Sequence, residues 1–273
     1  GAGKSTMLNA IAGVWPVDSG SVIIDGEDIT KLPEHKRAKY LGRVFQDPMN
    51  GTAADMEIEE NLAVAKRRGQ TRTLRWGITK KEREEYVELL KPLDLGLETR
   101  LRAKVGLLSG GQRQRIGIAR ALAVNPEFII ADEPVSALDV SIQAQILNLL
   151  MDLKDEFNFS YLFIAHDLSV VRHISDRLGV MYLGSIVEMG DKHTLFTNPV
   201  HPYTKVLFAA VPTVGEKPLV QGIDAKGEIP SPVNLPKGCY FSDRCPYATD
   251  RCRQEKPVLR EVEPGHMAAC HLL

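Results

Sequence analysis

The chain has 273 residues, of which 44% are hydrophobic and 25% charged, an ordinary balance for a globular protein with one core and an appendage. The 34 Lys and Arg residues nearly cancel the 35 Asp and Glu residues, and this argues against binding of nucleic acid through a broad basic surface. No apolar run approaches the roughly 18 residues that a membrane-spanning helix needs, and there is no signal peptide, so any membrane role requires a partner.

A glycine-rich pattern opens the chain. The segment Gly1-Ala2-Gly3-Lys4-Ser5-Thr6 resembles the second half of a phosphate-binding P-loop, G-x-x-x-x-G-K-[ST], so we expect the chain to be an N-terminally truncated fragment. Small residues let backbone N–H groups wrap phosphates, Lys4 supplies a point charge, and the Ser5 hydroxyl binds Mg²⁺. Because only half of the P-loop pattern is present, the segment could instead be a glycine turn before an ordinary helix.

The next segments predict a strand and then a helical region. Val22–Ile24 reads as a short strand closed by the turn dipeptide Asp25-Gly26. Residues 52–107 are charge-rich and poor in β-branched runs, and Lys80–Glu85 is typical of a solvated helix face. We interpret residues 52–125 as a helical subdomain inserted into the core.

Two apolar runs predict buried parallel strands. They are Phe128–Ala131 and Tyr161–Ala165, and the residues between them repeat at helical spacing. This is a right-handed βαβ unit, in which side chains at the carboxyl ends of the strands point into a ligand crevice. Asp132 and Glu133 end the first strand and predict a Mg²⁺ ligand and a base for an attacking water. The alternative is an exposed acidic turn before Pro134.

The segment Leu108-Ser109-Gly110-Gly111-Gln112 precedes another helix. Ser109 and Gln112 have the spacing of a capping box, and the glycines let backbone N–H groups approach an anion. A well-capped helix would be the plain interpretation. However, the pentapeptide resembles the signature of ABC-transporter ATPases, and it lies in the expected order between the P-loop and the Asp-Glu strand.

Three further residues match other motifs of that family. Gln46 resembles the glutamine that senses Mg²⁺ and the attacking water, Asp139 lies in a segment that resembles the loop at the dimer interface, and His166 resembles the histidine that contacts the γ-phosphate. Alone they would be a surface glutamine, a helix start and a structural histidine. The resemblance implies an α/β P-loop NTPase core with a parallel sheet, covering about residues 1–210. It also implies MgATP held between two subunits, with Ser109, Gly110, Gly111 and Gln112 of one facing the P-loop of the other.

From about residue 212 the composition shifts to Pro and Gly. We therefore predict a cassette over residues 1–211 and a loop-rich C-terminal extension over residues 212–273 that carries all four cysteines, Cys239, Cys245, Cys252 and Cys270. The extension, with His201-Pro202-Tyr203-Thr204, resembles that of the ATPases of dipeptide and oligopeptide importers.

The cysteines leave several interpretations open. Disulfides conflict with a reducing cytosol, and zinc sites favour closer pairs than C-x₅-C-x₆-C-x₁₇-C. Free thiols are one alternative, and a [4Fe-4S] cluster is what the peptide-importer resemblance implies. Far from the nucleotide motifs in sequence, these residues have a structural or docking role rather than a catalytic one.

The resemblance implies the ATP-hydrolysing subunit of a peptide importer on the cytoplasmic face of the membrane, paired with a second ATPase subunit, permease subunits and indirectly a solute-binding protein, with no nucleic-acid partner. The N-terminal half, with Met49–Ala53 and Lys104–Leu107, looks closer to importers of amino-acid-type substrates, so a hybrid joined near Ser109–Gln114 is considered. The alternatives are an amino-acid or other small-solute importer, a non-transport ABC ATPase and a P-loop kinase. The kinase would not need the Leu108–Gln112 element.

Overall fold

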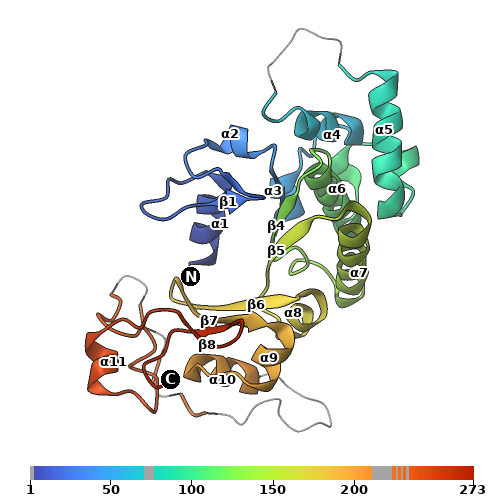
Figure 1. Cartoon of the computed structure of the whole chain (residues 1–273). Coiled ribbons are helices and arrows are strands. Elements are labelled where there is room, and N and C mark those ends of the chain that lie inside the picture. The colour runs from blue at the N-terminus through green and yellow to red at the C-terminus, as the bar shows by residue number, and fades with distance from the viewer. Residues whose placement is uncertain (1–2, 71–76, 211–222, 226, 229, 232–233) are drawn as a thin grey trace. The chain divides into compact units, whose positions relative to one another are not determined.

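The computed structural model describes residues 3–70, 77–210, 223–225, 227–228, 230–231 and 234–273. The chain divides into two compact units (Figure 1). The described residues of 6–166 form one unit. The described residues of 167–273, together with residues 3–5, form the other, and each unit has a hydrophobic core of its own.

A parallel sheet lies at the centre of the first unit. Its strands are β3 (Leu41–Val44), β4 (Phe128–Asp132) and β5 (Ser160–Ile164), in the order β3-β4-β5. The helix α7 (Val140–Phe157) connects β4 to β5 and buries its apolar stripe, including Ile146 and Leu150. The predicted βαβ unit is therefore confirmed, with its second strand shifted by one residue.

The core beside this sheet is built around the helix α1 (Lys4–Ala12). Leu8 packs with Ile130 and Ile164 of the sheet and with residues of a small hairpin. That hairpin joins β1 (Ile23–Ile24) to β2 (Glu27–Asp28) through Asp25 and Gly26, whose φ angles are +48° and +79°. Two positive φ values match a type I′ turn, which explains why Asp-Gly occupies it.

The buried Arg37 joins α1 to the hairpin. Its guanidinium lies at the end of α2 (Glu34–Arg37) and donates to the carbonyls of Ala10 and Ile11, at 2.8 and 2.7 Å, and of Leu32 and Thr30. The first two carbonyls belong to the last turn of α1. Carbonyls in the last turn of a helix have no N–H partner within the helix, and the partial negative charge at this end favours a nearby cation. Burial lowers the pKa of Arg37, although a guanidinium stays charged in proteins.

Helices dominate residues 48–122, as the sequence predicts. They are α3 (Pro48–Gly51), α4 (Ile58–Lys66), α5 (Lys80–Leu90) and α6 (Gly110–Leu122), with 3₁₀ turns at Lys91–Leu93, Leu97–Thr99 and Val105–Leu107. The helix α5 buries Tyr86 and Leu90 and exposes most of its charged residues, in agreement with a solvated face.

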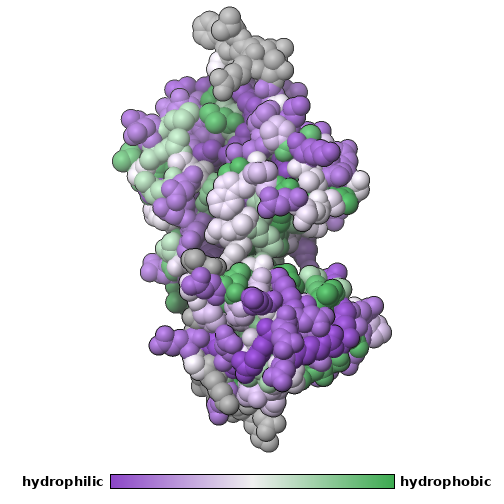
Figure 2. Space-filling view, turned by 90° about the vertical axis from the view of Figure 1, so that its left-hand side faces the viewer, coloured by the Kyte–Doolittle hydropathy of each residue, from purple (hydrophilic) through white to green (hydrophobic). Residues whose placement is uncertain are grey.

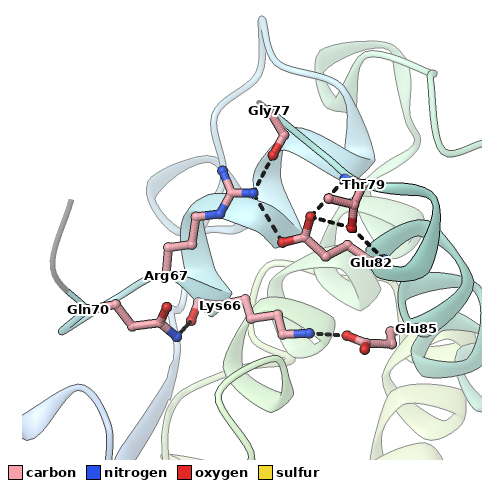
Figure 3. Close-up of polar contacts among 7 residues, drawn as sticks. All are labelled: Lys66, Arg67, Gln70, Gly77, Thr79, Glu82 and Glu85. Atoms are coloured by element: carbon pink, nitrogen blue, oxygen red, sulfur yellow. Dashed lines mark hydrogen bonds and ion pairs between the residues drawn. The ribbon is translucent and has the colours of Figure 1, made fainter. Parts of the chain in front are cut away.

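Polar contacts brace the end of α4 against the start of α5 (Figure 3). Arg67 donates to the carbonyl of Gly77 and to Glu82, while Lys66 pairs with Glu85. Glu82 also closes a capping box with Thr79, in which the Thr79 N–H donates to the Glu82 carboxylate over 2.8 Å. Exposed ion pairs contribute little stability, so these contacts mainly fix the geometry of this surface.

The second unit contains an antiparallel sheet with the order β6-β7-β9-β8. Its elements are α8 (Leu168–Ile174), β6 (Arg177–Tyr182), β7 (Ser185–Asp191), α9 (Lys192–Thr197), α10 (Pro202–Ala209), α11 (Asp250–Gln254), β8 (Arg260–Glu263) and β9 (His266–Ala268). The strands β8 and β9 belong to the extension that the sequence predicts as loop-rich, and β9 pairs with β7. The extension thus completes a sheet that the preceding segment begins.

On the face seen in Figure 2, hydrophobic residues are scattered among hydrophilic ones. No helix within the described part of the chain has the length and apolar character needed to span a membrane.

A buried carboxylate fixes β9 to β7. Glu188 is fully buried and accepts hydrogen bonds from the backbone N–H groups of Val200 and His201, at 2.7 and 3.1 Å. Its Oε1 atom lies 2.8 Å from Nε2 of His266 on β9, which is also buried. Charged groups are rarely buried unless they are paired, and Glu188 has three partners.

We expect His201 to make this unit sensitive to acid. His201 is 1% exposed, and its Nδ1 atom accepts the Tyr203 N–H at the start of α10, so only an imidazole with an unprotonated Nδ1 can form this cap. Burial lowers its pKa from 6.5 to about 4. The unfolded chain binds the proton more readily than the folded chain. The contribution of His201 to the free energy of unfolding is therefore complete above about pH 6.5 and decreases as the pH falls toward 4, by about 2 kcal/mol at pH 5.

Urea unfolding followed by circular dichroism at pH 7 and pH 5 measures this loss. The His201→Asn variant provides the matched control, because asparagine can cap the helix without titrating. An equal loss of stability in both proteins would contradict the assignment to His201.

Candidate functional site

Three polar side chains meet where the parallel strands end. Gln46 follows β3, Glu133 follows β4 and His166 follows β5. The register pairs Val44 with Ala131 and Asp132 with Ile164, so the three carboxyl ends lie side by side. This edge of a parallel sheet is where ligands of α/β proteins bind.

Glu133 lies between the other two side chains. Its Oε2 atom is 3.3 Å from Nε2 of Gln46 and 3.1 Å from Nδ1 of His166. The Glu133 side chain is 14% exposed and that of His166 is 66% exposed, so the carboxylate lies beneath a solvent-facing imidazole. If Nδ1 of a neutral His166 donates to the carboxylate, Nε2 is the acceptor on the outer side of the ring.

The backbone of Glu133 is strained. Its φ is +45°, a left-handed conformation that is uncommon for residues other than glycine, and its N–H donates to the carbonyl of Ile164 over 3.0 Å. Such conformations occur preferentially at functional sites, where surrounding contacts hold them. The strain turns the chain away from β4 directly after Asp132.

Ser136 and Gln114 hold the loop after Glu133. The Ser136 hydroxyl donates to the carbonyl of Glu133 at 3.0 Å and accepts from Gln46 at 3.3 Å. Gln114, which is 1% exposed, donates from α6 to the carbonyl of Pro134 over 2.6 Å. The helix that begins at Gly110 is thereby connected to the strained carboxylate.

The glycine segment before α6 forms the predicted cap. The Ser109 N–H donates to the Gln112 side chain at 3.1 Å, and the Gln112 N–H donates to the Ser109 hydroxyl at 3.3 Å. Ser109 and Gly110 are exposed. A Cβ atom on Gly111 would lie 3.0 Å from Ile142 of α7, which explains a small residue there. The Ser109 oxygen accepts in this cap, so its O–H proton is not used by the capping bond.

The helix α1 begins at Lys4 within the glycine-rich segment. Gly3 has a φ of +84°, a conformation that glycine adopts readily. Gly1 and Ala2 lie outside the described residues. Asp139 precedes α7, and its side chain forms no capping hydrogen bond.

The four cysteines line one cavity of the second unit. The cavity is small, with a volume of about 10 Å³, and Ser242, His201 and His271 also line it. All four thiols are free, and Cys252 and Cys270 are buried. Burial raises the pKa of Cys239 to about 11 and also raises the pKa values of Cys245 and Cys270. In the described parts of the chain, no three His, Cys, Asp or Glu side chains are grouped closely enough for one metal ion.

Comparison with known proteins places these features in a family. Residues 1–136 match the model of ABC transporters, and residues 187–252 match the model of the C-terminal region of oligopeptide/dipeptide transporters. An oligopeptide transport ATP-binding protein of Bacillus subtilis is 47% identical over 290 aligned positions that include all of this chain and 83% of the relative.

The chain belongs to the ABC transporter ATP-binding proteins.

Further comparisons agree with this membership. A di/tripeptide transport ATP-binding protein of Pseudomonas aeruginosa is 41% identical, with 99% of this chain and 83% of the relative covered. Among solved structures, the ADP conformation of an ATP-binding cassette is 30% identical, with a TM-score of 0.62 over 72% of this chain and 81% of that one. A dimeric post-hydrolysis cassette with bound ADP and phosphate is 32% identical, with a TM-score of 0.58 over 70% of this chain and 81% of that one.

Membership confirms the predicted α/β P-loop NTPase fold and the ATPase activity. An ABC ATPase uses ATP and functions with membrane subunits. Within this ABC cassette, the structure brings Gln46, Glu133 and His166 together. The sequence did not single out Gln114 or Ser136 as supports of Glu133, because a single hydrogen bond from a side chain to a backbone carbonyl leaves no periodic pattern. The residues Lys4 and Ser5 belong to the unit that contains residues 167–273.

Proposed function

We propose that this chain is the ATP-hydrolysing subunit of an importer of dipeptides or oligopeptides. The relatives at 41–47% identity over nearly the whole chain are named as peptide transport proteins, which supports peptides as the solute. The match of residues 187–252 to the C-terminal region of peptide transporters supports the same class. The cassette is proposed to span residues 1–211, with its helical subdomain at about residues 52–125. The extension is proposed to span residues 212–273.

The arrangement around Glu133 carries the proposed mechanism. Glu133 is the general base that takes a proton from the attacking water, because its carboxylate is held at one position by Gln46 and the strained backbone. Gln46 orients that water. His166, exposed above the carboxylate, contacts the γ-phosphate and keeps Glu133 oriented through its Nδ1 atom.

The remaining motif residues bind the nucleotide. Gly1, Ala2, Gly3 and Thr6 surround the phosphates with Lys4. Ser5, Gln46 and Asp132 would hold Mg²⁺, and their hydroxyl, amide and carboxylate oxygens are the hard donors that this ion prefers. When bound, Mg²⁺ neutralises charge on the phosphates and orients the γ-phosphate.

We propose that two subunits enclose each ATP. Ser109, Gly110, Gly111 and Gln112 of one copy, with its Asp139, face the phosphates bound by the other. The exposed Ser109 hydroxyl and the N-terminus of α6 suit an anion that arrives from outside the chain. The dimeric cassette with ADP and phosphate among the structural relatives supports this arrangement. ATP that binds the closed dimer better than the open one shifts the population toward closure.

The four cysteines are proposed to hold a [4Fe-4S] cluster. They fit the group in three respects: the donor set is four thiols, all line one cavity, and none is paired in a disulfide. Structural zinc sites favour closer pairs of cysteines than the spacing C-x₅-C-x₆-C-x₁₇-C. The cluster would join Cys239 and Cys245 of the loop region and Cys252 of α11 to Cys270, which follows β9, and so stabilise the extension.

The proposed partners are a second ATPase subunit, permease subunits and indirectly a solute-binding protein, with the chain peripheral on the cytoplasmic face of the membrane. The test is to purify the full-length protein with its membrane subunits, reconstitute the complex in liposomes, and measure ATP-dependent uptake of labelled dipeptides, oligopeptides and free amino acids. We expect uptake of peptides. Uptake of free amino acids alone would favour the small-solute alternative, and absence of any membrane subunit would favour a non-transport ABC ATPase.

A further inference from the structure

The cavity of the four cysteines contains one hydroxyl without a partner. Ser242 is 2% exposed and lines the cavity, and its Oγ atom has no hydrogen-bond partner among the described residues. Leaving a buried hydroxyl unpaired is unfavourable, and native proteins usually satisfy such groups. An unpaired hydroxyl on a residue that lines a cavity therefore indicates a ligand in that cavity.

The backbone holds Ser242 between two of the thiols. Its N–H donates to the carbonyl of Cys239 at 3.0 Å, and the N–H of Cys245 donates to the carbonyl of Phe241 at 2.9 Å. These turns set Ser242 within the loop that joins Cys239 to Cys245. Its neighbour Phe241 is 1% exposed and packs against Tyr182 and Tyr203, so the position of the loop is fixed by its core contacts.

The other polar groups at the cavity already have partners. Nδ1 of His201 accepts from Tyr203, and Nε2 of His271 lies 2.9 Å from the carbonyl of Glu255. A hydroxyl also lies close to one thiol, because Oγ1 of Thr249 is 3.3 Å from Sγ of Cys252. Ser242 is thus an unpaired donor among the residues that line the cavity together with the four cysteines.

We infer that Ser242 donates a hydrogen bond to a sulfur of the group that the four cysteines bind. The inference rests on the proposed cluster and adds a positioning residue to it. Hydrogen bonds to the sulfurs of an iron–sulfur cluster stabilise its more negative, reduced form and raise the reduction potential. Ser242 therefore sets the potential of the cluster and slows its loss, while the four thiolates supply the iron ligands.

The experiment compares the full-length wild type, Ser242→Ala and Ser242→Thr, each purified without oxygen. Ser160→Ala, at an exposed position of β5, is the matched control. Iron and acid-labile sulfide per chain, the reduction potential followed by electron paramagnetic resonance, and the rate of cluster loss in air are measured. For Ser242→Ala we expect wild-type iron content, a lower potential and a loss rate increased by up to about tenfold, the effect of one hydrogen bond. Ser242→Thr restores the donor and moves both values back toward wild type.

The outcomes separate the two proposals. A wild type that holds no iron and sulfide after anaerobic reconstitution, or holds zinc instead, overturns the cluster and the inference together. A loaded wild type whose potential and loss rate equal those of Ser242→Ala overturns the role of Ser242 alone. The metal-free proteins give a further readout: Ser242→Ala is expected to melt at the same temperature as wild type or higher, because it removes an unpaired hydroxyl. A lower melting temperature would assign Ser242 a purely structural role.

Discussion

Replacing Glu133 with glutamine is expected to lower ATP hydrolysis by about 10²- to 10⁴-fold, the usual contribution of a general base, while ATP binding persists. The amide has the shape of the carboxylate, so it can occupy the same place between Gln46 and His166, but it cannot accept the proton of the attacking water. Because the nucleotide is no longer consumed, the closed state should accumulate. Phosphate release, nucleotide binding and size-exclusion chromatography with ATP measure the three effects.

Glu127→Gln is the matched control for this variant. Glu127 precedes β4, at the opposite end from Glu133, and is exposed. It should retain wild-type hydrolysis. Turnover at the native rate by Glu133→Gln would remove Glu133 from the role of base.

For the wild type, the isolated chain should hydrolyse ATP slowly and with a steep dependence on protein concentration. Full activity in a strictly monomeric sample would contradict the shared site.

The cluster of Gln46, Glu133 and His166 illustrates what the sequence reveals about a site. Gln46, Glu133 and His166 are separated by 87 and 33 residues in the chain. Glu133 and His166 follow the two apolar runs that predict parallel strands, and parallel strands end at one edge of a sheet, so the topology brings these two residues together. The strand before Gln46, β3, contains Gly42 and Arg43, so it has no continuous apolar run and the sequence does not predict it. The strain at Glu133 could not be predicted, because a glutamate after a strand does not by itself indicate a positive φ.

The C-terminal extension shows where such reasoning stops. The strands β8 and β9 have four and three residues, too short for a period-two pattern to stand out, and proline-rich sequence precedes them. Of the two, β9 lies beside β7 and β8 pairs with β9. The buried pair of Glu188 and His266, 78 residues apart, contributes to the pairing of β7 with β9, and a linear pattern of hydrophobic residues does not encode such a contact.

The four-cysteine cavity depends on the close approach of two backbone segments at Gly238. A Cβ atom at this position would lie 2.3 Å from the carbonyl oxygen of Cys252 and 2.6 Å from the carbonyl carbon of Arg253. The neighbouring Cys239 N–H donates to that same Cys252 carbonyl over 2.7 Å. The carbonyl therefore cannot move away from an added methyl group without loss of the hydrogen bond that brings Cys239 and Cys252 to one cavity.

Gly238→Ala is accordingly expected to destabilise the second unit by about 3 kcal/mol or more, at the upper end of the cost of overpacking, and to expose the thiols. Urea unfolding and the rate at which the four cysteines react with a thiol reagent measure both effects. Gly117→Ala is the control, since Gly117 lies inside α6 with open space around it, and alanine there should raise stability by up to about 1 kcal/mol. Thiol reactivity equal to that of wild type would show that the two segments can separate without opening the cavity, and the joint role of Cys239 and Cys252 would then have to be abandoned.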